Sequence, residues 1–138
     1  MTSSKHIAMI ALLVRDYDEA IAWYRDAMDF ELLEDDDRGG GKRWVRMALQ
    51  GNTGFSLLLA KTANSRQREC VGNQHGGRVG FFLHTDNFAR DRARLIAAGA
   101  QFEELPRHEE YGTVAVFADL YGNRWDLIEP CASKGAAE

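Results

Sequence analysis

The sequence is poor in cysteine, in excess positive charge and in long apolar runs. Only Cys70 and Cys131 occur in 138 residues, and they form no CxxC pair, so nothing favours a disulfide framework or a thiolate metal site. The net charge of −4 gives no electrostatic basis for binding nucleic acid or an anionic membrane. No apolar run approaches the roughly 18 residues of a membrane span, and the first residues lack the small-residue cleavage site of a signal peptide. We therefore expect a cytoplasmic protein without nucleic-acid or membrane partners.

What the sequence does contain is the composition of an ordinary globular protein. Apolar residues make up 45% of the chain and charged residues 28%, which is typical of soluble domains. The length is sufficient for one compact domain with a sizeable core. We therefore expect residues 1–138 to form a single domain.

The first half of the chain predicts one helix and four extended segments. Residues 7–14 are an apolar strand candidate, and Asp16 with Glu19 three residues later resembles a capping box that starts a helix over residues 16–28. Residues 30–34 resume an extended pattern, and the acidic and glycine-rich residues 35–41 predict a solvated turn. The remaining strands of this half form a hairpin, at residues 43–49 and 55–60.

The second half repeats this order about 70 residues later, which is typical of an internal duplication. It follows a polar segment, residues 61–78, that we interpret as a linker or a lid. A strand at 79–83 precedes a helix over 86–98, capped by Asp86, and then an extended segment at 101–105. A hairpin at 112–130 turns over the cluster Asp-Leu-Tyr-Gly-Asn at 119–123, and residues 131–138 are a tail. The prediction is an α+β fold with a strand–helix–three-strand module at about 6–62 and another at 79–130.

Alternation along the strands separates two faces of the predicted sheet. One face is wholly apolar and should pack against the helices. The other is largely apolar but carries a histidine, an arginine and an aspartate. A mostly apolar concave surface with a few convergent polar groups is typical of a small-molecule site, although a surface that pairs with a second subunit would look similar. This second face includes Met9, Leu13, Ser56, Leu58, Gly80, Phe82, His84, Arg124, Asp126 and Ile128.

Three short motifs carry a resemblance to a known family. They are VRD at 14–16, AWY at 22–24 and DLYGNRWDL at 119–127. Together with the doubled order of elements over residues of about 6–130, the chain resembles the vicinal oxygen chelate superfamily, which includes glyoxalase I, bleomycin-resistance proteins and extradiol dioxygenases. The resemblance implies that two tandem βαβββ modules form a curved mixed sheet around a cavity, with the helices on the convex face.

The resemblance also implies where a metal would bind. Catalytic members of the superfamily hold a divalent ion, which acts as a Lewis acid, with His and Glu side chains from both modules. Carried over position by position, these ligands fall on Met9, Ser56, Gly80 and Asp126. Only Asp126 is a possible ligand, and the three substitutions leave too few donors for a tetrahedral or octahedral site. We therefore expect neither a divalent metal nor another cofactor.

Three functions follow from this reading. The first is a metal-free protein, similar to the bleomycin-resistance branch, that binds a small organic molecule in the sheet cavity. The second is a lyase, isomerase or dioxygenase that uses His84 and Asp126, with or without a metal, so whether the protein is an enzyme stays open. The third is a non-catalytic module that dimerises through the sheet face; a homodimer is expected in any case.

The binding hypothesis assigns a role to each polar side chain. Arg124 meets an anionic or carbonyl oxygen of the ligand with its planar fork of donors, and Asp126 pairs with Arg124 and orients it. His84 adds a second, pH-sensitive contact. The expected ligand-binding residues are Met9, Leu13, Ser56, Leu58, Phe82, His84, Arg124 and Asp126, with Ile128 adding apolar area.

Overall fold

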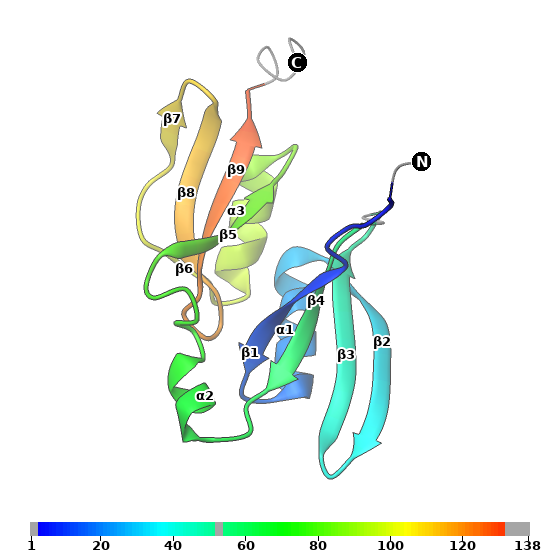
Figure 1. Cartoon of the computed structure of the whole chain (residues 1–138). Coiled ribbons are helices and arrows are strands. Elements are labelled where there is room, and N and C mark those ends of the chain that lie inside the picture. The colour runs from blue at the N-terminus through cyan, green and yellow to red at the C-terminus, as the bar shows by residue number, and fades with distance from the viewer. Residues whose placement is uncertain (1–2, 52–53, 132–138) are drawn as a thin grey trace. The chain divides into compact units, whose positions relative to one another are not determined.

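The computed structural model describes residues 3–51 and 54–131. The chain divides into two compact units, Met1–Glu69 and Cys70–Glu138, and Figure 1 shows a helix behind a sheet in each. The predicted α+β class is confirmed, with two mixed sheets of four and five strands. A single domain, and a cavity formed jointly by the two modules, stay predictions. No helix of the described residues is long and apolar enough to cross a membrane.

The first unit is a four-stranded sheet covered on one face by a helix. The sheet order is β1-β4-β3-β2; β1 and β4 are parallel, and the other neighbours are antiparallel. The elements are β1 (Met9–Val14), α1 (Tyr17–Met28), β2 (Phe30–Gly39), β3 (Lys42–Leu49) and β4 (Ser56–Lys61).

Helix α1 begins where the sequence predicts. The Asp16 side chain accepts a hydrogen bond from the backbone N–H of Glu19 at 2.8 Å, which satisfies one of the free donors of the first turn. The helix buries Ala20 and Tyr24 against the sheet face that carries Leu12 and Val14, and all four are fully buried. This contact is the core of the first unit.

Strand β2 is longer than the sequence predicts. Residues 35–39 continue the strand and pair with β3, so the predicted turn over 35–41 is wrong except at Gly40-Gly41. The acidic residues are tolerated because β2 is an edge strand whose outer end is exposed, where charges also discourage pairing with another chain. Gly40 and Gly41 turn the hairpin with φ of +64° and +82°, a region in which glycine carries no steric penalty.

The segment between the modules contains a short helix, α2 (Ser65–Cys70), which the interpretation of residues 61–78 as a linker or a lid did not include. The Asn64 side chain accepts from the backbone N–H of Gln67 at 2.9 Å, and Gln67 Oε1 accepts from the N–H of Ala63 at 2.7 Å. A polar cap followed three residues later by glutamine is a capping-box signal, so the sequence did contain evidence for this helix.

The second unit has the same order of helix and strands as the first, but its edge strand is divided in two. Its sheet order is β5-β9-β8-β6, with β5 and β9 parallel; β7 also pairs with β8. The predicted extended segment 101–105 is a strand only at its first two residues, and residues 103–106, which end in Pro106, separate β6 from β7. The elements are β5 (Val79–His84), α3 (Phe88–Ala97), β6 (Gln101–Phe102), β7 (Arg107–Glu109), β8 (Gly112–Ala118) and β9 (Arg124–Pro130).

Helix α3 is capped by Asn87 rather than by Asp86 as predicted. The Asn87 side chain accepts from the N–H of Arg90 at 3.0 Å, whereas Asp86 forms an exposed ion pair with Arg90 at 2.9 Å. Both residue types are good caps, so composition alone did not decide between neighbours. In the same unit, the Trp125 ring stacks on two neighbouring rings. Its centroid lies 4.5 Å from that of Phe81 and 6.0 Å from that of Phe117.

Candidate ligand-binding site

The face of the first sheet opposite α1 brings together the predicted site residues of the first module. The strand register places Met9 opposite Ser56, and Ala11 opposite Leu58. Leu58 in turn lies opposite Arg46. We call this surface the open face of the first sheet; it is an apolar strip bordered by one arginine.

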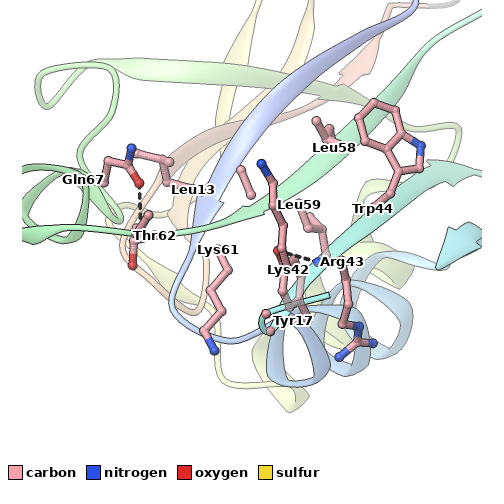
Figure 2. A pocket seen from close by; sticks show the side chains of 14 residues that line it. Leu13, Tyr17, Lys42, Arg43, Trp44, Leu58, Leu59, Lys61, Thr62 and Gln67 are labelled. Atoms are coloured by element: carbon pink, nitrogen blue, oxygen red, sulfur yellow. Dashed lines mark hydrogen bonds between the residues drawn. The ribbon is translucent and has the colours of Figure 1, made fainter. Parts of the chain in front are cut away.

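A cavity of about 730 Å³ opens at the end of this face. Figure 2 shows Leu58 beside Trp44, with Leu13 farther to the left, and all three line the cavity. Two of the predicted residues, Leu13 and Leu58, therefore line a cavity within the first unit alone, whereas Met9 and Ser56 are not among its lining. The full lining is Leu13, Tyr17, Gly40, Gly41, Lys42, Arg43, Trp44, Leu58, Leu59, Ala60, Lys61, Thr62, Ala63 and Gln67.

A polar network fixes the side chains that border the strip. Glu34 Oε1 accepts from Arg46 Nη1 at 2.5 Å and from Trp44 Nε1 at 3.2 Å. These two bonds, the Arg46 bond first, lower the pKa of the Glu34 carboxyl. Arg46 Nε also donates to Ser56 Oγ at 3.2 Å. The Trp44 ring is thus held in one orientation beside the cavity, as a preorganised binding surface requires.

Sequence reasoning missed Arg46 and Trp44 as parts of this face. The alternation that buries Val45 and Met47 sends Trp44 and Arg46 to the side of Leu58, and the register agrees. Applying the same alternation to residues 43–49 as to the other strands would have found both residues.

Arg43 closes the cavity on the helix side. Its guanidinium pairs with Asp35 at 2.7 Å and with Asp18 at 3.0 Å and lies over the Tyr17 ring, 5.0 Å from the centroid. Its backbone N–H donates to Tyr17 Oη at 3.1 Å. The Arg43 hydrogen bond lowers the pKa of the Asp35 carboxyl. Arg43 therefore links β3 to α1 and β2, and its positive charge is already neutralised by two carboxylates.

The corresponding face of the second sheet carries the other predicted residues. Phe82 lies opposite Asp126, and His84 lies opposite Ile128. Phe82 is 63% exposed, and His84 is also exposed. The prediction that these residues share a face is consistent with this register. Whether they bind a ligand stays a prediction.

The predicted pairing of Arg124 with Asp126 is wrong. Arg124 pairs instead with Glu103, with Nη2 to Oε1 at 2.7 Å and Nε to Oε2 at 2.9 Å, and its Nη1 donates to Gly77 O at 2.9 Å. The hydrogen bonds to Glu103 raise the pKa of the Arg124 guanidinium. Glu103 lies in the break between β6 and β7, the two parts of the edge strand, so alternation within β9 could not reveal it.

Asp126 is left with a buried oxygen, Oδ1, that has no hydrogen-bond partner among the described residues. Burial is the main cause that raises the pKa of its carboxyl, with a further rise from Glu104 that Arg107 and Arg124 oppose. A carboxyl with this environment favours the protonated form more than an exposed aspartate does.

The turn between β8 and β9 is built on Asp119, which is 5% exposed. Its Oδ1 accepts from the backbone N–H groups of Tyr121, Gly122 and Asn123 at 3.0 to 3.1 Å. Its Oδ2 accepts from Asn123 Nδ2 and Trp125 Nε1, both at 3.0 Å. The Asp119 carboxylate thus holds the hairpin that positions Arg124 and Asp126.

The fold of the two units agrees with a comparison against known protein families. The model of the Glyoxalase/Bleomycin resistance protein/Dioxygenase superfamily matches residues 6–127. The chain belongs to this superfamily.

A protein sequence and two crystal structures illustrate what this chain is similar to. An uncharacterized protein of Shewanella frigidimarina (strain NCIMB 400) is 49% identical over 124 residues, which are 89% of this chain and 92% of that protein. The crystal structure of UcmS2 has a TM-score of 0.77 at 25% identity and covers 92% of this chain and 99% of its own. TnmS3, an antibiotic-binding protein from Streptomyces sp. CB03234, has a TM-score of 0.75 at 27% identity and covers 95% of this chain and 100% of its own.

The residues at the superfamily's metal-ligand positions do not fit a His and Glu site. Ser56 is 2% exposed, and its hydroxyl lies within hydrogen-bond distance of Ala8 O and Arg46 Nε. Gly80 carries no ligand atom, and the ring of His75 lies 2.3 Å from where a Cβ would be. Within the described residues, no group of three or more His, Cys, Asp or Glu could hold a metal ion. That the protein binds no metal and no other cofactor stays a prediction.

Proposed function

We propose that the protein binds a small organic molecule on the open face of the first sheet. The observation that carries this proposal is the cavity of about 730 Å³ over Leu13 and Leu58, a size within the range of small-molecule sites. The similarity to an antibiotic-binding protein, TnmS3, supports a binding function. The proposal is independent of any metal.

Each part of the cavity has a role in this function. Leu13 and Leu58 supply an apolar floor, and about 100 Å² of apolar area covered by a ligand contributes roughly 2.5 kcal/mol. The Trp44 ring adds a flat aromatic wall, held by Glu34. Lys42 and Gln67 at the rim provide polar contacts that fix the ligand's orientation.

A second candidate function is acid–base catalysis on the second sheet. It rests on Asp126, whose pKa is raised mainly by burial, because a general acid is effective when its pKa lies nearer to the working pH. In this reaction, of the lyase or isomerase class, Asp126 would exchange a proton with the substrate, and His84 would help to position the substrate. Asp126→Asn would then abolish turnover and leave ligand binding in the first sheet unchanged.

The test of the binding proposal is a ligand screen with one blocking variant and one matched control. Planar antibiotics and aromatic acids are screened by thermal shift and by tryptophan fluorescence. Leu58→Glu places a negatively charged side chain in the cavity, and we expect at least a tenfold loss of affinity, equal to about 1.4 kcal/mol. Ile96→Glu makes the same kind of change at an exposed position of α3 and should leave affinity unchanged. Equal affinity of the two variants would overturn the proposal.

A further inference from the structure

We propose that the molecule bound in the first unit's cavity is an organic anion, and that its negative group is bound by the ammonium of Lys42. This inference rests on the proposed function, since it names the chemical class of ligand for the same cavity.

The charge of the cavity lining differs from that of the whole chain. The chain has 21 acidic and 17 basic residues. The lining of the cavity contains three basic residues, Lys42, Arg43 and Lys61, and no acidic one. An acidic protein that lines one cavity with cations and excludes carboxylates from it favours a negatively charged ligand there.

Of the three cations, Arg43 is already neutralised by Asp35 and Asp18. The two lysines differ, because neither ammonium has an ion-pair partner in residues 3–51 and 54–131. A ligand anion would therefore pair with a lysine ammonium without displacing a carboxylate of the protein.

The position of the two lysines selects Lys42. Lys42 has the same strand parity as Trp44, which lies on the open face with Leu58. Lys61 has the parity of Leu59, which belongs to the helix-covered face. Figure 2 agrees: the Lys42 ammonium extends toward the side of Leu13 and Leu58, whereas the Lys61 ammonium points to the opposite side. A molecule over the apolar floor thus meets Lys42 first.

The neighbours of Lys42 indicate the rest of the ligand. The Trp44 ring and the leucine floor favour a flat apolar body, and a single ammonium at the rim binds a point charge such as a carboxylate or a sulfonate. The predicted class is an aromatic acid, with its ring system against Trp44 and its charged group at the cavity mouth.

The test uses two probes that differ only in charge. 1-Anilinonaphthalene-8-sulfonate carries a sulfonate, and N-phenyl-1-naphthylamine has the same ring system without it. Their dissociation constants are measured by fluorescence titration at low salt for the wild-type protein, Lys42→Met, Lys61→Met and Leu58→Glu. We expect the wild type to bind the sulfonate probe about five- to tenfold more tightly, a preference typical of one partly exposed charge pair.

Lys42→Met should remove this preference and leave the affinity for the neutral probe unchanged, because the methionine keeps the aliphatic stem. Lys61→Met should retain the preference, and 0.5 M NaCl should reduce it in the wild type by screening. Equal affinity of the two probes for the wild type, or loss of the preference in Lys61→Met alone, would overturn the inference and leave the proposed function standing. Unchanged binding of both probes to Leu58→Glu would instead contradict the proposed function.

Discussion

Replacing Asp119 by alanine should destabilise the second unit severely. The Asp119 carboxylate accepts hydrogen bonds from three backbone N–H groups and from the side chains of Asn123 and Trp125. Three of these donors are fully buried, namely Asn123 N, Asn123 Nδ2 and Trp125 Nε1. Alanine offers none of them an acceptor.

The magnitude follows from those three donors. A buried donor without a partner costs about 1–3 kcal/mol, so three cost roughly 3–9 kcal/mol if nothing replaces the carboxylate. Water that enters the space of the removed side chain satisfies part of this demand. We therefore expect a loss of about 3–4 kcal/mol, a large share of the roughly 5–15 kcal/mol that stabilises a typical domain.

The assay is urea unfolding, followed by tryptophan fluorescence and circular dichroism, with the free energy of unfolding taken by linear extrapolation. Asp119→Asn keeps one acceptor oxygen and should lose less than Asp119→Ala. Asp36→Ala removes an exposed acid of β2 and should change the free energy of unfolding by about 0.5 kcal/mol or less. A loss below about 1 kcal/mol in Asp119→Ala would refute the reasoning that this carboxylate holds the hairpin.

Four further predictions follow from the structure and the sequence. Gly72→Ala should destabilise the protein more than Gly40→Ala, because both have positive φ but only at Gly72 would a Cβ lie 1.8 Å from a backbone oxygen, that of Tyr121; thermal unfolding compares them. The folded-state pKa of Asp126 is raised. The stability that its carboxyl contributes is therefore present below the unfolded-state pKa and is lost as the pH rises through the folded-state pKa. Asp126→Asn should therefore raise the melting temperature relative to wild type at pH 8 more than at pH 4, and an equal effect at both would contradict the burial argument. Elemental analysis of the purified protein should show well below one equivalent of zinc, nickel, iron or manganese. Sedimentation should show a homodimer at high micromolar concentration, and a monomer would contradict that expectation.

Local signals in the sequence were sufficient for much of the fold. The Asp16 cap, the helical spacing of Ala20 and Tyr24, and the turn cluster at 119–123 each depend on residues within a few positions of one another, so each could be predicted. The repeat of the same order in the second half then predicted the architecture. The miss at residues 35–39 has a different cause: acidic residues were interpreted as a turn, although an exposed edge strand accommodates them equally well.

The polar contacts of the site depended on registers that a sequence does not display. Arg124 of β9 forms hydrogen bonds with Glu103, 21 residues earlier. Glu103 belongs to the break in the edge strand on the far side of β8, so only the strand order reveals this partner. Arg46 meets Glu34 through the pairing of β2 with β3. Alternation states which face a side chain occupies, but the partner on that face is decided by strand order and by irregularities such as the break before β7.

The most direct test of the binding site is a nuclear magnetic resonance titration of nitrogen-15-labelled protein with the strongest ligand of the screen. The Trp44 indole N–H, which donates to Glu34, is assigned by comparison with Trp44→Phe. The account predicts saturable shifts of this indole resonance and of the backbone amides of residues 58–62. Saturable shifts confined to residues around Phe82 and Asp126, with the Trp44 indole unmoved, would contradict it.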